Sequence, residues 1–100
     1  MFKDTDRNII DIEPLNPVIK GHRLIIPRQH VSDFKDNPAI TAEVMEYVSR
    51  LASDLETFGN PDWNIITSAG SFASQTVWHF HVHLIPRRLN DGLKLPWTKY

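Results

Sequence analysis

The sequence predicts an α+β fold in which one main helix packs on one face of a small antiparallel sheet. Two observations support this prediction. A long apolar stripe has helical spacing, and short apolar runs bounded by proline, glycine and asparagine lie on both sides of it. The chain has 100 residues, of which 41% are hydrophobic. That is enough for one compact core, so we expect residues 1–100 to form a single domain.

The helix is expected to begin after Asn37, a good capping residue, with Pro38 in the first helical position. Apolar residues then recur three and four positions apart, at Val44, Val48, Leu51, Leu55 and Phe58. Gly59 follows this stripe, at a point where a left-handed residue ends many helices. The stripe is interpreted as core packing, and the helix is given no chemical role.

The strands are expected at residues 7–12, 22–27, 62–67 and 77–85. Prolines close three of these segments, because a residue without an N–H does not extend a hydrogen-bonded ladder. Asn60 and Pro61 provide a turn before the third strand. Residues 68–74 are small and polar, which is typical of a loop.

Composition narrows the classes of function. Eleven basic and twelve acidic side chains give a net charge of −1, which argues against charge-driven binding to nucleic acid or to an anionic membrane. The chain has no cysteine, so disulfides, thiol nucleophiles and cysteine–zinc sites are excluded. No apolar run approaches the roughly 20 residues that cross a bilayer. The first residues also lack the features of a secretion signal, so we expect a cytoplasmic protein.

Three of the five histidines, His79, His81 and His83, fall in the last expected strand. Alternate strand residues face the same way, so all three imidazoles would project from one face, with successive Cα atoms about 6.6 Å apart. The residues that would face the helix are Trp78, Phe80, Val82 and Leu84. A solvated strand face normally carries mixed polar residues, so three aligned imidazoles point to chemistry.

Two chemical roles fit such a set of imidazoles. They can share a metal ion, since His-x-His supplies two ligands, or they can act as nucleophile and proton carriers. The loop at residues 68–74, followed by Gln75 and Thr76, offers backbone and side-chain donors for phosphate oxygens. No carboxylate lies near the histidines in sequence to complete a metal site or its outer shell. The sequence favours phosphate chemistry, with no metal and no cofactor.

The run His-Phe-His-Val-His-Leu-Ile-Pro-Arg at residues 79–87 resembles the signature of the histidine-triad (HIT) family of nucleotide hydrolases and transferases. Three more segments resemble motifs of that family: Gln-Thr-Val at 75–77, Gly-His-Arg-Leu-Ile-Ile-Pro with His30 at 21–30, and Asp11-Ile12 with Pro14. They occur in the family's order over roughly residues 9–97. Four blocks in order are far more specific than one His-x-His-x-His.

The resemblance implies a two-step reaction at the α-phosphate of a nucleoside phosphate derivative. His81 would attack phosphorus and form a nucleotidyl-histidine, which water or another acceptor resolves. His79 and His83 would bind and protonate oxygens around phosphorus, and His22 would orient or tune one of them. The implied substrates are dinucleoside polyphosphates, phosphoramidates or adenylylated adducts of a purine nucleotide. A regulatory nucleotide-binding module with little turnover is the alternative.

The same resemblance implies which residues bind the nucleotide. The ribose and base would be contacted by Asp11, Ile12 and Leu24. The phosphate oxygens and the leaving group would be contacted by Ser68, Gln75 and Thr76. Simpler interpretations remain open, since Asp11 suits a turn before Pro14, and Ile12 and Leu24 suit a core.

Some features depart from the family pattern. Ser68 stands where the family often has asparagine, so a phosphate contact would be lost or bridged by water. The family's N-terminal extension, with its extra strand and cysteine pair, is expected to be largely missing, and with it the family's zinc site. His30 is interpreted as structural, and Arg87 and Arg88 as solvated strand-end charges. Trp97 would cover a site or simply pack, and the family implies a homodimer whose sheets join.

Overall fold

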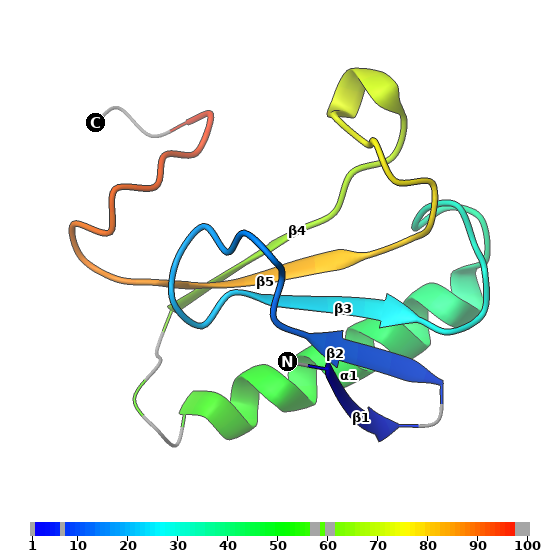
Figure 1. The fold of residues 1–100 in the computed structure, drawn as a ribbon, viewed down its shortest axis with the longest axis horizontal. Helices are drawn as coiled ribbons and strands as arrows, with labels where there is room; N and C mark the ends of the chain where they lie inside the picture. Colours follow the sequence, from blue (N-terminus) through cyan, green and yellow to red (C-terminus); the bar gives the residue numbers. More distant parts are fainter. Residues whose placement is uncertain (1, 7, 57–58, 60–61, 98–100) are drawn as a thin grey trace.

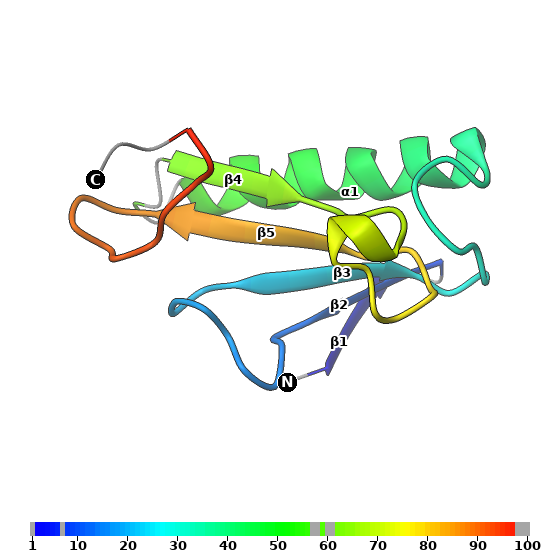
Figure 2. The same cartoon turned by 90° about the horizontal axis from the view of Figure 1, so that it is seen from above.

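The computed structural model describes residues 2–6, 8–56, 59 and 62–97. Within them, a 5-stranded antiparallel sheet has the order β1-β2-β3-β5-β4 (Figure 1). Its strands are β1 (Phe2–Asp6), β2 (Ile9–Ile12), β3 (Arg23–Pro27), β4 (Asp62–Ile66) and β5 (Val82–Arg87). One long helix, α1 (Pro38–Glu56), lies along one side of this sheet (Figure 2). The predicted α+β fold with one main helix on a small antiparallel sheet is confirmed.

The helix begins where the sequence predicts. Two backbone N–H groups, of Ala39 and Ile40, donate to Asn37 Oδ1 at 3.1 and 3.3 Å, so Asn37 caps the helix and Pro38 opens it. Phe58 lies outside the described residues. Gly59 has a φ of 89°, in the left-handed region expected after the helix. No helix of the described residues is both long and apolar enough to span a membrane.

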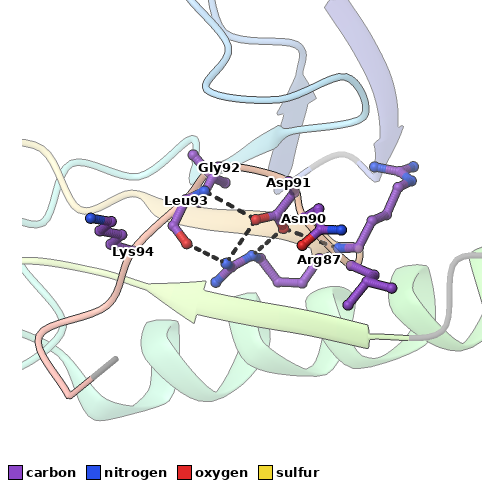
Figure 3. Close-up of a pocket in the computed structure, with 8 residues that line it drawn as sticks. Arg87, Asn90, Asp91, Gly92, Leu93 and Lys94 are labelled. Carbon is purple, nitrogen blue, oxygen red and sulfur yellow. Dashed lines mark hydrogen bonds and ion pairs between the residues drawn. The ribbon is translucent and has the colours of Figure 1, made fainter. Parts of the chain in front are cut away.

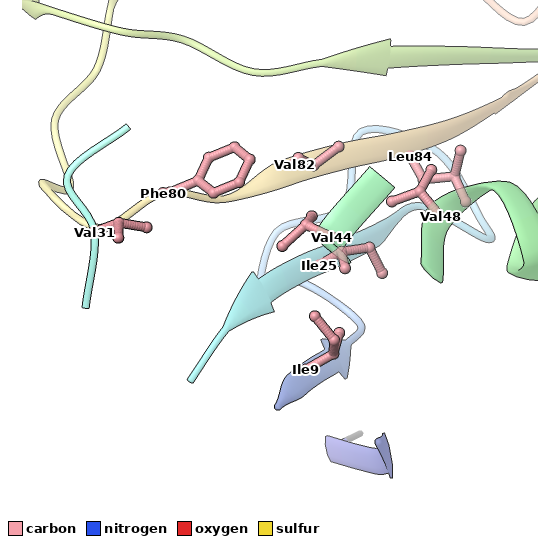
Figure 4. Close-up of a cluster of buried hydrophobic side chains, with 8 residues drawn as sticks. All are labelled: Ile9, Ile25, Val31, Val44, Val48, Phe80, Val82 and Leu84. Carbon is pink, nitrogen blue, oxygen red and sulfur yellow. The ribbon is translucent and has the colours of Figure 1, made fainter. Parts of the chain in front are cut away.

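The core lies between α1 and the sheet (Figure 4). Val44 and Val48 of the predicted stripe are fully buried there. The other buried members come from the strands and from the segments next to them: Ile9, Ile25, Val31, Phe80, Val82 and Leu84. Alternate residues of the last strand region therefore pack on the helix, which leaves the intervening residues for the other side of the sheet.

The predicted boundaries of the last strand are wrong at both ends. The strand begins at Val82 rather than residue 77, because the chain bends at residues 77–79 and Phe80 donates its N–H to the Val31 carbonyl at 2.7 Å instead of joining a ladder. Trp78 is consequently 53% exposed and does not face the helix. The strand also continues through Pro86, where β5 pairs with β4 on one side only, an environment that tolerates a missing N–H.

The N-terminal part of the sheet also differs from the prediction. The strand expected at residues 7–12 is β2, which starts at Ile9, and Arg7 lies outside the described residues. The additional strand expected to be largely missing is present as β1, which pairs with β2. The sequence of β1, Phe-Lys-Asp-Thr-Asp, has no apolar alternation that would predict a strand. The turn expected at Asn60–Pro61 lies outside the described residues.

Candidate active site

The face of the sheet opposite α1 carries one histidine of the triad beside apolar side chains. Cross-strand partners in an antiparallel pair project to the same side. Ile12 pairs with Leu24, Leu24 with His83, and His83 with Ile66, so these four residues share a face. We call this the open face. Leu24 and Ile12 therefore lie on the same side of the sheet as His83.

His22 and His83 form a hydrogen-bonded pair at this face. His22 Nε2 lies 2.9 Å from His83 Nδ1, and the Val18 N–H donates to His22 Nδ1 at 3.1 Å. A backbone N–H only donates, so Nδ1 of His22 accepts and its Nε2 carries the proton in the neutral ring. His22 then donates to His83, which leaves the remaining nitrogen of a neutral His83, Nε2, as an N–H donor.

The pair is held in the neutral state by its surroundings. Burial lowers the pKa of His22, whose exposed fraction is 3%. The pKa of His83 is lowered to about 4, first by burial and then by the neighbouring His22 and His81 rings. Both rings are therefore neutral near pH 7, and His83 offers a neutral N–H rather than an imidazolium.

His81 has its tautomer set by the backbone. Its Nδ1 lies 2.8 Å from the carbonyl oxygen of His79, which only accepts a hydrogen bond. The neutral ring therefore carries its proton on Nδ1, and Nε2 keeps a lone pair. The His81 and His83 rings have centroids 5.4 Å apart at 79°. A nitrogen with a lone pair and an N–H donor thus come from neighbouring imidazoles.

His79 belongs to a second pair of rings. Its Nε2 donates to the Pro27 carbonyl at 2.8 Å, and its Nδ1 lies 3.4 Å from Nδ1 of His30. The His30 and His79 rings meet edge to face, with centroids 5.1 Å apart. The structure thus brings His30 to the triad. No group of three or more histidine, cysteine, aspartate or glutamate residues in the described ranges is arranged to hold a metal ion.

Gln75 organises the loop that precedes the triad. Its side chain is buried, its Oε1 accepts from the Gly70 N–H at 2.8 Å, and its Nε2 donates to the carbonyls of Ser32 and Val77 at 2.6 and 3.1 Å. Both amide hydrogens are thereby used within the protein. Gln75 shapes the loop, whereas the other two predicted phosphate contacts remain accessible: Thr76 is exposed and Ser68 is half-buried.

Asp11 is not brought to the histidines. It pairs with Ile25, which packs under α1, so its carboxylate lies on the helix side of the sheet. Its Oδ1 accepts from Arg23 Nε and Nη2 at 2.9 and 2.7 Å, and its Oδ2 accepts from the Tyr47 hydroxyl at 2.7 Å. With an exposed fraction of 1%, Asp11 is placed to join β2 to β3 and α1, not to meet a ribose.

Two groups that sequence reasoning missed act on the histidines. The Val18 N–H fixes the tautomer of His22, and the Thr67 hydroxyl donates to the backbone carbonyl of His81 at 2.6 Å. A backbone amide has no signal in the sequence, because every residue except proline carries one. Thr67 closes an apolar strand segment, where threonine is ordinary, so its contact with His81 also had no distinctive pattern.

Comparison with known proteins decides the relationship that the motifs suggested. The model of the HIT domain matches residues 5–90. The chain belongs to the HIT family. This matched range contains His22, His79, His81 and His83, together with the loop at residues 68–74 and the two residues after it.

Two curated relatives carry names of enzymes. An adenylylsulfatase of Arabidopsis thaliana is 31% identical over 78% of this chain and 41% of its own length. An adenosine 5'-monophosphoramidase of Saccharomyces cerevisiae is 34% identical over 83% of this chain and 52% of its own length. The chain thus spans about half the length of these HIT relatives or less.

A solved structure of similar fold is the HIT family protein of Bacillus anthracis. It is 31% identical, has a TM-score of 0.84, and the aligned region covers 99% of this chain and 72% of that one. The likeness extends over the sheet and the helix together. The arrangement of β3 and β5 that brings His22 to His83 therefore lies within the shared HIT fold.

The C-terminal segment of this HIT domain is anchored by Arg87. Its guanidinium donates to both carboxylate oxygens of Asp91 at 2.7 and 3.1 Å and to the Leu93 carbonyl at 2.8 Å (Figure 3). It also donates to Asn64 Oδ1 at 2.6 Å. The contact raises the pKa of Arg87 and lowers that of Asp91. The interpretation of Arg87 as a solvated charge is wrong.

The same segment borders several hollows at the far end of β5 from His81, among them one of about 680 Å³ that is lined by residues 19–21 and 88–91. One of about 490 Å³ is lined by residues 87–94. Another, of about 180 Å³, lies between the C-terminal segment and the open face, and it is lined in part by Val18, Ile66, Ile85 and Leu93. Trp97 is 75% exposed. Arg88 is exposed, as predicted.

Proposed function

We propose that this HIT domain is a nucleotide hydrolase or nucleotidyltransferase that acts at the α-phosphate of a nucleoside phosphate derivative through His81. The observation that carries the proposal is the tautomer of His81. Its Nδ1–H is held by the His79 carbonyl, so Nε2 has a free lone pair beside the N–H of His83. The names of two relatives, an adenylylsulfatase and an adenosine 5'-monophosphoramidase, support the same class of substrate.

The first step forms a bond between His81 Nε2 and the α-phosphorus. The bond from phosphorus to the leaving oxygen or nitrogen breaks, and its electron pair departs with the leaving group, which takes a proton from a donor or from water. His81 becomes an N-phosphorylated imidazolium that keeps its Nδ1 proton. The His79 carbonyl accepts a hydrogen bond from that proton, so it stabilises the positive charge as it develops.

The His83 N–H supports the phosphorus centre. His22 donates to His83 Nδ1, so the Nε2–H of His83 is free to bond a phosphoryl oxygen or the leaving atom. A neutral donor costs less to bury than an imidazolium, which agrees with the low pKa of His83. Negative charge spread over phosphoryl oxygens makes such fixed donors effective.

The second step returns the enzyme to its first state. Water, or another acceptor, attacks the same phosphorus, the nitrogen–phosphorus bond breaks, and its electron pair returns to His81 Nε2. The attacking water loses one proton, and the product is a nucleoside monophosphate. The purine base is proposed to pack on Ile12 and Leu24, which lie on the open face beside His83. Ser68 and Thr76 are proposed to contact phosphate oxygens from the loop.

Rapid-quench labelling tests the covalent step. Adenosine 5'-phosphoramidate with radiolabel at its phosphate is mixed with protein and quenched in alkali, because phosphohistidine bonds are labile in acid. Wild type is expected to form an alkali-stable, acid-labile protein adduct within the first turnover. His81→Ala is expected to form none, while its unfolding midpoint stays near that of wild type.

Two outcomes would contradict the proposal. Turnover by His81→Ala at the rate of wild type would remove His81 from the reaction. Absence of any adduct in wild type, together with tight binding of adenosine monophosphate, would favour the alternative of a regulatory nucleotide-binding module. Measurement of adenosine monophosphate binding by calorimetry separates these two results.

A further inference from the structure

We infer that Thr67 is a positioning residue for His81, and that its hydroxyl holds the backbone of the nucleophile in place. The inference rests on the proposed function of His81. It starts from one contact, in which Thr67 Oγ1 donates to the carbonyl oxygen of His81 at 2.6 Å. Thr67 follows directly on β4, and His81 directly precedes β5.

The contact lies where the ladder between two strands stops. β4 and β5 pair from Asp62 with Arg87 as far as Ile66 with His83. Beyond that pair the two segments of the chain separate, because residues 68–75 form the loop that Gln75 organises. The carbonyl of His81 therefore lies just past the last ladder pair. At this point the hydroxyl of Thr67 supplies the hydrogen-bond donor for the His81 carbonyl, in place of a backbone N–H of the ladder.

His81 depends on this support more than a strand residue would. Phe80 on one side is anchored by its N–H to Val31 and by its buried ring, and Val82 on the other side is fully buried. Between these two anchors, the ring of His81 bonds to the His79 carbonyl, only two residues back. The position of the ring thus follows the torsion angles of residues 79–81. Thr67 restrains one peptide group within that short span.

Loss of the hydroxyl should affect chemistry more than binding. Thr67 contacts the backbone and not the side of the ring that would meet phosphorus, so substrate affinity has little reason to change. A nucleophile that is displaced by about 1 Å loses rate, because the attack needs alignment with the breaking bond. The tautomer of His81 should also become less uniform, since the carbonyl of His79 would no longer be held at a fixed place relative to Nδ1.

The test compares three variants of the full chain. Thr67→Val removes the donor with nearly the same shape, and Thr67→Ser restores a hydroxyl. Thr41→Val is the matched control, because Thr41 Oγ1 also donates to a backbone carbonyl, that of Phe34, at 2.6 Å, but at the start of α1. Each protein is measured for the rate of adduct formation, for KM and for unfolding midpoint.

Thr67→Val is expected to slow adduct formation about tenfold with KM within about twofold, as for a misaligned nucleophile. Thr67→Ser should recover most of the rate, and Thr41→Val should react like wild type even if it unfolds more easily. Adduct formation by Thr67→Val at the wild-type rate would overturn the inference. An equal loss of rate in Thr41→Val would do so too, since it would indicate a general effect of lost stability.

Nitrogen-15 NMR of labelled imidazoles gives a readout that does not depend on turnover. Wild-type His81 should show one neutral tautomer with the proton on Nδ1, and Thr67→Val should show a growing share protonated on Nε2. The same spectrum in both proteins would overturn the positioning role. If wild type shows the Nδ1 tautomer but forms no adduct, the proposed reaction fails while the structural effect of Thr67 is still measured.

Discussion

At the scale of single residues, the backbone decides where the imidazole protons lie. The Val18 N–H makes Nδ1 of His22 an acceptor, and the His79 carbonyl makes Nδ1 of His81 a donor. Two rings of the same residue type therefore present opposite tautomers. One can pass a hydrogen bond to His83, and the other can attack an electrophile. The difference arises from peptide groups, which donate only through N–H and accept only through oxygen.

His83 is expected to titrate far below an ordinary histidine. NMR titration of its ring protons should give a midpoint near pH 4 in place of the usual 6.5. His22→Ala should raise the pKa of His83, because it lets in water and removes a neighbouring positive charge at low pH.

A control and a contradicting result define this titration. His30→Ala should leave the midpoint of His83 unchanged, since the ring of His30 contacts His79 and not the His22–His83 pair. A wild-type midpoint close to 6.5 would show that the two rings are not held in the buried, neutral arrangement described above.

At the scale of elements, the sequence predicted those parts whose signal is local. The cap at Asn37 and the apolar stripe with Val44 and Val48 depend on neighbours in the chain, and both were predicted. The start of β5 depends on the contact of Phe80 with Val31, about fifty residues away in the chain, and the sequence did not predict it. The motif resemblance indicated the histidines of the candidate site. The orientation of the Asp11 side chain toward α1 could be inferred only once the strand register was known.

The Asp11 network is expected to support the packing of α1 and not nucleotide binding. Asp11→Ala should lower the free energy of unfolding by about 3 kcal/mol, because it leaves Arg23 without its buried partner. Tyr47→Phe removes one hydrogen bond to the same carboxylate and should cost about 1 kcal/mol. Urea unfolding measures both values. A rise in KM for Asp11→Ala without any loss of stability would instead support the predicted contact with ribose.

At the scale of the whole molecule, the two faces of the sheet carry different kinds of residues. One face packs on α1 and contains the core, and the open face carries His83 with Ile12 and Leu24. The loop that contains the short 3-10 helix η1 (Ser71–Ala73) and the C-terminal segment rise over opposite ends of β5 (Figure 1). The homodimer, in which two sheets would join, stays a prediction. In the described sheet β4 is an edge strand, and its Ile65 is 49% exposed.

The two neutral histidines should make the fold sensitive to mild acid. Folding lowers the pKa of His83 from 6.5 to about 4, so between these values the unfolded chain binds a proton that the native chain does not. The free energy of unfolding should therefore fall as the pH drops from about 6.5 toward 4, and this contribution should then level off. His22 acts in the same direction.

Urea unfolding at several pH values measures this effect, with His83→Gln as the comparison. The variant should lose less stability between pH 6.5 and 4 than wild type does. Asp91 and Asp36 also have lowered pKa values, but from 3.8, so their contribution to the free energy of unfolding is lost only at more acidic pH. If the free energy of unfolding fell equally with pH in wild type and in His83→Gln, the result would contradict the neutral state of His83.

The bond from Val18 to His22 has a consequence for how this site tolerates change. An amide hydrogen belongs to the main chain, so nineteen of the genetically encoded residue types would supply it at position 18. Only an imino acid removes it, and Val18→Pro would free His22 to adopt the other tautomer and reverse the direction of its bond to His83. Variation at position 18 therefore carries almost no information about its importance, although its N–H determines which nitrogens of His22 and His83 carry protons.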